Sequence, residues 1–323
     1  MDIIRIGTRG SRLALRQAGL VQEALLHAFH QIRTEIVILH TKGDNILDRP
    51  MNRIGGKGIF VSEFEQALLE DRIDLAVHSA KDLPMSLAEG LVIAAVLPRG
   101  DVRDVLVVPK WAGLPFFLQD HGGAGTSAGG RSDGKPENAP FIIGTGSIRR
   151  QTQAVRLWDS VVCENIRGNV DSRLRKLEEG GYDGIILAKA GLDRLGGGQE
   201  WEERFEFYPL HPGAFLPAAC QGIIAVEARG NSPLAAMCRQ FTDWDTELCF
   251  LTERELLSYL ASDGGESGKE VCSTAAAAWC RREGENLTLD VMYAEKRCTC
   301  SCRAELEAGL QTAREAARRV KPG

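Results

Sequence analysis

Residues 141–151 read Phe-Ile-Ile-Gly-Thr-Gly-Ser-Ile-Arg-Arg-Gln. The apolar residues at the start are typical of a short buried strand, and the pattern after Ser147 is typical of a helix. Backbone N–H groups at a helix start attract anions, and the planar guanidinium of Arg149 or Arg150 matches a carboxylate or a phosphate. This turn therefore predicts an anion site at the end of a strand. The alternative is that Ser147 only caps the helix and that both arginines are solvated.

The residues on both sides of this turn alternate between short apolar runs and amphipathic helices. Ser11 is expected to cap one helix, and Ser62-Glu63-Phe64-Glu65 is expected to form a capping box near the start of another. Such repeated units predict an α/β fold with a parallel or mixed sheet and helices on both faces. We expect strands at residues 3–6, 35–39, 73–77, 92–97, 105–108, 141–143, 161–162, 184–188 and 223–227, and a helix at residues 170–179.

The composition changes in two places. Residues 122–138 are rich in Gly, Ser and Ala without periodicity, which is typical of a flexible surface insertion. After about Asp243 we expect a helix at residues 246–260, two strands at 274–280 and 287–293, and a final helix at 303–320. The C-terminal part therefore reads as a small α+β domain.

The composition also limits the partners. The 323 residues carry a net charge of −5, which disfavours bulk attraction to nucleic acid or to an anionic membrane. No apolar run approaches the roughly 20 residues of a membrane helix, and the N-terminus has no signal-peptide pattern. The 9 cysteines are an odd number spread over a long chain, which favours reduced thiols in the cytoplasm.

Polar clusters follow the predicted strands. Ligands of open α/β sheets lie beyond the carboxyl ends of the strands, so we expect a cleft between two α/β units that binds several carboxylates or phosphates. Several of these residues also have a plain alternative: a mobile turn for residues 55–58, a packing histidine for His78 and an ion pair for Lys81 and Asp82. Arg173 and Arg175 could belong to a solvated helix face, which is the favoured interpretation for Arg175. The clusters contain Arg9 and Ser11, residues 41–44, Lys57, Lys81 and Asp82, Thr145 to Arg150, Arg167, Arg173 and Arg194.

The cysteines point to thiol chemistry at one position. Cys298-Thr-Cys-Ser-Cys302 lacks the spacing of a zinc site, so no metal is expected there. Cys163, Cys238 and Cys249 lie in apolar or helical patterns and are interpreted as buried small hydrophobes. Cys272 follows a glycine-rich stretch, and a nucleophilic or attachment role for it stays open beside a structural one.

Taken in order, several segments resemble the porphobilinogen deaminase family, also called hydroxymethylbilane synthases. The resemblance covers nearly the whole length. The matching segments are Ile6-Gly-Thr-Arg-Gly-Ser11, Gly55-Gly-Lys-Gly-Ile-Phe-Val61, His78-Ser-Ala-Lys-Asp-Leu-Pro84, Gly144-Thr-Gly-Ser-Ile-Arg-Arg-Gln151, Ile166-Arg-Gly-Asn-Val170 with Arg173, Ala190-Gly-Leu-Asp-Arg-Leu-Gly196 and Leu216-Pro-Ala-Ala-Cys-Gln-Gly222.

The resemblance implies a transferase of tetrapyrrole biosynthesis. Such an enzyme joins four porphobilinogen molecules head to tail, releases ammonia at each step and yields hydroxymethylbilane. The polypyrrole product grows on a dipyrromethane cofactor held by a thioether to a cysteine, here Cys272. It also implies a cytoplasmic monomer whose partner is the small-molecule substrate, with no nucleic acid and no membrane.

The implied architecture has two periplasmic-binding-protein-like α/β domains with a substrate cleft between them and a small C-terminal α+β domain. Domain 1 takes residues 1–100 with 222–242 and carries the catalytic carboxylate. Domain 2 takes residues 101–221, is rich in arginine and includes a flexible insertion at 112–140. Domain 3 takes residues 243–323 and carries the attachment cysteine.

The resemblance also implies roles for individual residues. Asp82 would be the catalytic carboxylate, because an anion stabilises the cation left when ammonia departs. No residue is expected to bind metal. Cofactor binding falls to Cys272, Lys57, Asp82, Thr145, Ser147, Arg149, Arg150, Arg173 and Arg194, and substrate binding to Arg9, Ser11, Arg149, Arg167, Arg173 and Gln221.

The chain departs from the family pattern around the cysteine. Extra residues separate Gly265 from Cys272, and Ala275 stands where a proline is expected. Cys280 is therefore the fallback attachment residue. Cys220 replaces a usual glycine before Gln221. A non-catalytic or impaired homologue that acts as a periplasmic-binding-type anion-binding protein is the alternative function.

Overall fold

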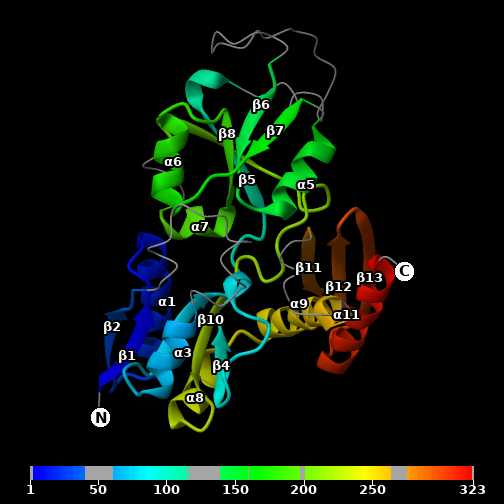
Figure 1. Cartoon of the computed structure of the whole chain (residues 1–323). Helices are drawn as coiled ribbons and strands as arrows, with labels where there is room; N and C mark the ends of the chain where they lie inside the picture. Colours follow the sequence, from blue (N-terminus) through cyan, green and yellow to red (C-terminus); the bar gives the residue numbers. More distant parts are fainter. Residues whose placement is uncertain are drawn as a thin grey trace. The chain divides into compact units, whose positions relative to one another are not determined.

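The structure is a computed structural model that describes residues 3–40, 61–113, 115, 139–158, 160–196, 201–262 and 275–321. It divides into two compact units, one made of Met1–Val102 with Leu216–Gly323 and the other of Arg103–Phe215. The described strands form a five-stranded sheet in each unit and a three-stranded sheet in the first unit (Figure 1). The predicted α/β class with two similar units and a smaller C-terminal α+β part is confirmed.

The first unit begins with a mixed sheet in the order β2-β1-β3-β10-β4. β1 runs parallel to β2 and β3, whereas β10 runs antiparallel to β3 and β4. The strands are β1 (Ile3–Thr8), β2 (Arg33–Ile38), β3 (Leu75–Ser79), β4 (Leu91–Val96) and β10 (Ile224–Arg229), and the helices are α1 (Arg12–Ala28), α3 (Ser62–Leu69), η2 (Ala80–Asp82), α8 (Pro233–Cys238) and η4 (Arg239–Phe241). Buried apolar residues of α1, such as Val21 and Leu25, pack on Ile6 and Leu75 of this sheet.

The second unit repeats this order in its own sheet, β7-β6-β8-β5-β9. β6 runs parallel to β7 and β8, whereas β5 runs antiparallel to β8 and β9. The strands are β5 (Asp104–Pro109), β6 (Phe141–Gly144), β7 (Val161–Glu164), β8 (Gly184–Ala188) and β9 (Phe205–Pro209), and the helices are η3 (Lys110–Ala112), α5 (Ile148–Leu157), α6 (Val170–Glu178) and α7 (Lys189–Arg194). One cluster of buried residues lies on each face, with Phe215 in one and Trp201 in the other.

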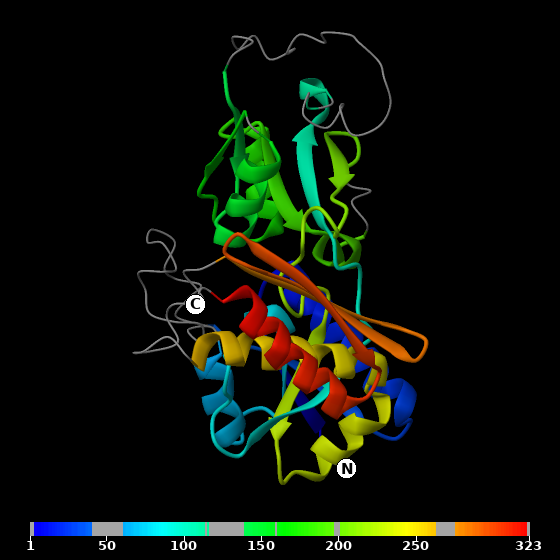
Figure 2. The same ribbon diagram turned by 90° about the vertical axis from the view of Figure 1, so that its right-hand side faces the viewer.

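The C-terminal part of the first unit is an antiparallel meander covered by two helices. Its elements are α9 (Trp244–Ser262), β11 (Ala276–Glu283), β12 (Asn286–Tyr293), β13 (Lys296–Arg303) and α11 (Leu306–Val320). Figure 2 shows α9 and α11 running side by side across one face of these strands. Their core is continuous with the end of β3, because Ala80, Leu83, Phe250 and Leu289 belong to one buried cluster.

Local structure confirms some predictions and corrects others. Ser11 caps α1, since its hydroxyl accepts from the N–H of Ala14 at 3.3 Å. The capping box at Ser62 is wrong: Val61 is the N-cap, and the Glu65 carboxylate accepts from the backbone N–H of Ala88 instead. The elements β9, β13, α7 and α8 were not expected from the sequence.

The chain leaves and re-enters the first unit along two adjacent segments. The N–H of Gly100 donates to the carbonyl of Gly222 at 3.0 Å, and the Gln221 amide donates to the carbonyl of Val102 at 2.8 Å. Gly222 has a φ of +90°, and a Cβ there would lie 2.6 Å from the Gly100 carbonyl oxygen. Only glycine fits this close backbone approach without displacement.

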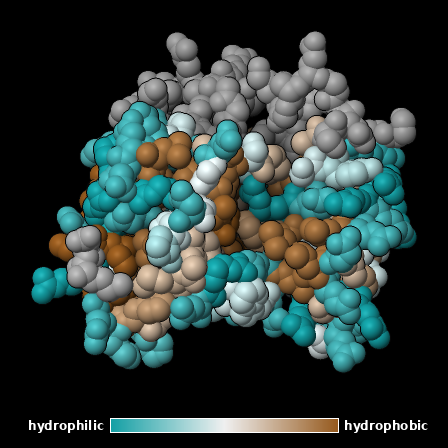
Figure 3. Space-filling view, turned by 90° about the horizontal axis from the view of Figure 1, so that it is seen from below, coloured by the Kyte–Doolittle hydropathy of each residue, from teal (hydrophilic) through white to brown (hydrophobic). Residues whose placement is uncertain are grey.

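One face of the molecule is of mixed polarity. Figure 3 shows hydrophobic side chains on this face separated by hydrophilic ones. Within the described ranges, no helix is both long and apolar enough to cross a membrane.

Candidate active site

One edge of the first sheet collects the polar residues predicted for this unit. Because β1 and β3 are parallel, their carboxyl ends meet at this edge and place Arg9, Ser11 and Asp82 there. β10 runs the other way, with Ile224 opposite Ser79, so Gln221 just before it lies at the same edge. Arg9, Ser11 and Asp82 therefore share one sheet edge, as predicted, and Gln221, which the sequence analysis placed in domain 2, lies at this edge as well.

Asp82 ends a short helical turn that is anchored on both sides. The N–H of Ala80 donates to the carbonyl of Ile223 at 3.0 Å, and the Leu83 side chain is buried in the core shared with α9. Asp82 itself is exposed. The turn thus holds a carboxylate in solvent on a backbone that is fixed before and after it.

His78, just before this turn, is a packing histidine. Its Nε2 lies 2.9 Å from Oε2 of Glu227 on β10, and its ring meets Phe64 edge-on at 5.3 Å. Both His78 and Glu227 are buried. The packing alternative is therefore confirmed for His78.

The carboxyl edge of the second sheet carries the cationic cluster. The parallel strands β6, β7 and β8 end there, so the residues that follow each strand gather at one edge. The sequence-predicted residues at this edge are Thr145, Ser147, Arg149, Arg150, Arg167, Arg173 and Arg194. The structure brings all seven to the same edge of one sheet.

Arg149 and Arg150 both bind one buried carboxylate, Asp104. Arg149 Nη1 donates to Oδ2 of Asp104 at 2.8 Å, while Arg150 donates through Nε at 3.1 Å and Nη2 at 2.7 Å to Oδ1. Arg150 also donates to the carbonyl of Ile186 at 2.8 Å. Arg149 and Arg150 are each only 6% exposed, so the alternative of solvated arginines is wrong, although Ser147 does cap α5.

Asp104 was not predicted from the sequence as a residue of this site. It is the first residue of β5, and because β5 runs antiparallel to β8 it lies opposite Ala188 at the carboxyl edge of β8. Burial alone would raise the pKa of Asp104, but the charges of Arg149 and Arg150 hold that pKa well below its ordinary value. Two cations against one anion leave this cluster with a net positive charge.

The remaining arginines differ in exposure. Arg173 is half-buried and its Nε donates to the carbonyl of Gly168 at 2.8 Å. Burial lowers the pKa of the half-buried Arg194, and the charge of Asp193 opposes that shift. The Arg175 side chain is 71% exposed beside Glu179, which confirms the solvated helix face predicted for it.

Two predicted site residues, Lys57 and Cys272, lie outside the described residues. The fallback cysteine, Cys280, lies in β11 and is 1% exposed. A hydrogen bond with Cys249 and burial both raise the pKa of the Cys280 thiol, with the charge of Glu253 adding to them. A thiol that stays protonated is a poor nucleophile, so Cys280 is ill suited to attachment.

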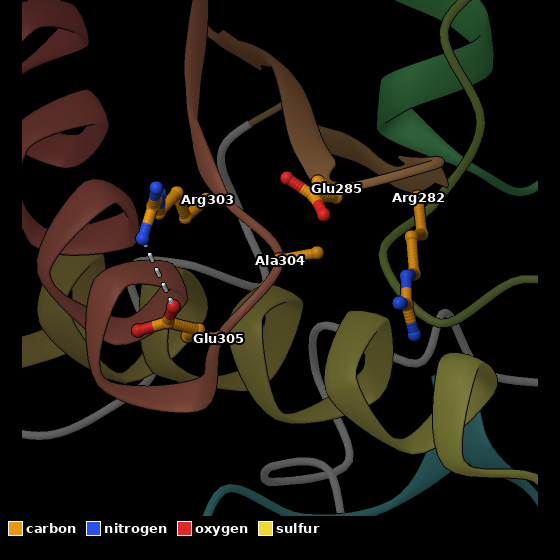
Figure 4. Close-up of a pocket in the computed structure, with 5 residues that line it drawn as sticks. All are labelled: Arg282, Glu285, Arg303, Ala304 and Glu305. Atoms are coloured by element: carbon orange, nitrogen blue, oxygen red, sulfur yellow. Dashed lines mark ion pairs between the residues drawn. The ribbon is translucent and has the colours of Figure 1, made fainter.

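A separate polar pocket of about 270 Å³ lies in the C-terminal part of the first unit. Arg282, Glu285, Arg303, Ala304 and Glu305 line it (Figure 4). Arg303 and Glu305 face each other at 3.9 Å, and the Arg303 side chain is 79% exposed. Exposed pairs of this kind contribute little and do not mark a ligand site.

Comparison with known proteins matches the chain to one family. The family model "Porphobilinogen deaminase, dipyromethane cofactor binding domain" matches residues 4–236. The chain belongs to the porphobilinogen deaminase family. A porphobilinogen deaminase of Syntrophobacter fumaroxidans is 43% identical over 81% of this chain and 77% of its own. Another, of Acetivibrio thermocellus, is 40% identical over 91% of this chain and 88% of its own.

Comparison with solved structures finds proteins of low sequence identity to this chain. The VFT2 domain of BvgS from Bordetella pertussis matches with 12% identity and a TM-score of 0.43, over 74% of this chain and 86% of that chain. Such a likeness says nothing about what this chain binds.

The residues at the second sheet edge fit the cofactor of this family. A dipyrromethane carries carboxylate side chains, which require hydrogen-bond donors and cations. The edge offers the Thr145 and Ser147 hydroxyls and several guanidiniums, against one buried carboxylate, Asp104. This donor set suits a polycarboxylate.

Proposed function

We propose that the chain is a hydroxymethylbilane synthase, a transferase that joins four porphobilinogen molecules head to tail with loss of ammonia. Family membership across residues 4–236 supports the reaction class. Two observations, one from each unit, carry the proposal in this chain. The first unit holds an exposed carboxylate, Asp82, just beyond β3, and the second unit gathers a net cationic cluster at the ends of its own strands. The reaction needs both kinds of group.

Each group has a separate task. In every addition the aminomethyl C–N bond of porphobilinogen breaks and ammonia leaves. A C–C bond then forms between the methylene carbon left behind and the terminal pyrrole of the bound chain, which loses a proton from the bonded carbon. After four additions, water releases the tetrapyrrole and supplies the hydroxyl of its hydroxymethyl group. Asp82 stabilises the positive charge that develops and moves the proton, a role that ordinarily contributes about 10²- to 10⁴-fold in rate. The carboxylates of the growing chain are bound by Arg9, Ser11, Arg149, Arg167, Arg173 and Gln221.

We further propose that a dipyrromethane, bound through a thioether to Cys272, supplies the ring onto which the first substrate adds. Lys57, Thr145, Ser147, Arg149, Arg173 and Arg194 would hold its carboxylates. Arg150 uses Nε, Nη1 and Nη2 on Asp104 and Ile186. We therefore assign Arg150 to holding Asp104 and Arg149 in place more than to contacting the ligand directly.

The domain division predicted from the sequence, with residues 243–323 as a domain of its own, also remains a proposal. So do the cytoplasmic location and the monomeric state, which rest on the cysteine content and on the family. Gel filtration at several protein concentrations tests the monomer, because a monomer keeps one elution volume throughout.

A turnover assay tests the function. Purified protein is incubated with porphobilinogen, and ammonia and the tetrapyrrole product are measured together. The proposal predicts one ammonia released per porphobilinogen consumed and one linear tetrapyrrole for every four. Binding of porphobilinogen without ammonia release would instead support the non-catalytic anion-binding alternative.

A further inference from the structure

The segment that follows Asp82 is held by a residue from a distant part of the sequence. Arg254 on α9 donates from Nη2 to the carbonyl of Pro84 at 2.7 Å and to the carbonyl of Met85 at 2.7 Å. The two acceptors lie two and three residues after Asp82. One NH₂ group thus fixes the backbone on the downstream side of the turn.

Arg254 has no carboxylate partner within the described part of the chain. Its half-buried guanidinium lies over the Phe250 ring at 5.5 Å, and its hydrogen bonds go to the two carbonyls. Removing a cation from water is costly unless other groups replace the hydrogen bonds of its hydration shell. This guanidinium is therefore held in place by the groups that accept its hydrogen bonds, here the carbonyls of Pro84 and Met85.

Helix α9, which carries Arg254, is itself held in place by the contacts of the neighbouring residue. The preceding residue, Glu253, is fully buried and accepts from Arg99 Nη1 at 2.7 Å and from the backbone N–H of Cys280 at 2.6 Å. It also accepts from the N–H of Cys220. Glu253 therefore ties α9 to the segments before and after the second unit and to β11, and Arg254 reaches out from this rigid point.

We infer that Arg254 is a positioning residue for the Asp82 turn. It contacts neither substrate nor cofactor in this account but sets where the Asp82 carboxylate stands through the Pro84 and Met85 carbonyls. The inference rests on the proposed function for its kinetic consequence, whereas its structural consequence is independent of that function. A misplacement of about 1 Å at a reacting group can lower a rate about 100-fold.

Hydrogen exchange and kinetics of four proteins test this inference. The proteins are the wild type, Arg254→Gln, Arg254→Lys and the control Arg314→Gln, which removes a guanidinium from α11 that pairs with Glu255 on α9. Arg254→Gln should raise amide exchange in peptides covering residues 83–88 by about tenfold or more while peptides of β3 keep their protection. It should lower kcat by about tenfold or more and change KM by less than about threefold. Arg254→Lys, which keeps the charge, should fall between, and Arg314→Gln should match the wild type.

Unchanged exchange at residues 83–88 in Arg254→Gln would overturn the inference. A rise in KM with an unchanged kcat would overturn it as well. If Arg254→Gln does not fold, the same comparison is made with Arg254→Lys, and wild-type exchange in that variant counts against the proposal. A wild-type protein that does not turn over porphobilinogen refutes the proposed function, and the exchange result still decides the role of Arg254.

Discussion

Nη1 of Arg149 lies 2.8 Å from Oδ2 of Asp104, and both side chains are buried. The pair joins the start of β5 to the first turn of α5, and Arg150 binds the other oxygen of the same carboxylate at 2.7 Å. The cationic edge of the second unit is therefore built around a buried anion. Its charge and its geometry depend on Asp104.

Replacement of Asp104 by Asn should destabilise the protein strongly. The change leaves two buried guanidiniums without their counterion, which costs about 3–5 kcal/mol in the free energy of unfolding. Urea unfolding measures this loss. Glu179→Gln is the control, because its pair with Arg175 is 3.9 Å long and exposed and should change stability by less than about 0.5 kcal/mol. Equal effects of the two substitutions would contradict the account.

Stability should also fall in acid because of Asp104. Its pKa in the folded state is lowered, while the unfolded carboxyl titrates at about 3.9. The stabilisation is thus complete above the unfolded pKa and is lost as the pH falls toward the folded one. Asp74, whose pKa is also lowered in the folded state, against the effect of burial, by hydrogen bonds and the charge of Arg5, adds to this slope and remains in the variant.

Unfolding of wild type and Asp104→Asn at several pH values checks this sign. The difference in unfolding free energy between the two proteins should be largest near pH 6 and should shrink below about pH 4. A difference that stays constant or grows in acid would show that the carboxylate is not the stabilising form.

Gly222→Ala should destabilise the segments that link the two units. The new Cβ would lie 2.6 Å from the carbonyl oxygen of Gly100, where the clash is with backbone and not with a flexible side chain. The matched control is Gly90→Ala, since Gly90 has a φ of +85° and no atom lies within 4 Å of the position that a Cβ would take there. We expect about 1 kcal/mol of loss for Gly90→Ala from the backbone conformation alone, and at least about 2 kcal/mol more for Gly222→Ala. Thermal unfolding of both variants distinguishes the clash from the φ effect, and equal losses would argue against the close approach.

Asp82→Asn should leave the fold intact and nearly abolish turnover. The side chain is exposed, so its neutral isostere should change stability little, while kcat should fall by about 100-fold or more. Steady-state kinetics measure the change, with Asp245→Asn as the control because its carboxylate pairs with Arg282 on the surface at 2.5 Å. Near-normal turnover in Asp82→Asn would remove Asp82 from its catalytic role.

Local signals were sufficient for the strand ends and for two helix caps. Ser11 and Ser147 cap their helices with their own hydroxyls, an interaction that spans three residues and can be recognised from the sequence. Thr145, Arg149 and Asp82 were placed beyond strands because apolar runs and turn residues mark those boundaries. These features depend on neighbours in the chain.

Other features depend on contacts that the sequence does not mark. Asp104 reaches the cationic edge because β5 runs antiparallel to β8, and strand direction is set by the whole sheet. The carboxylate of Glu65, expected to cap a helix, instead accepts from the backbone N–H of Ala88, which lies 23 residues away in the sequence. In contrast, the sequence does carry a signal for β13 that the prediction missed. Its alternating residues Cys298, Cys300 and Cys302 pack on the core as one face of a strand, with polar residues between them.

The most direct test of the account is the intact mass of the purified protein and of Cys272→Ala. We expect the wild type to exceed its sequence mass by one dipyrromethane and Cys272→Ala to have the mass of its sequence alone. A wild-type protein that turns over porphobilinogen at its unmodified sequence mass would contradict the account.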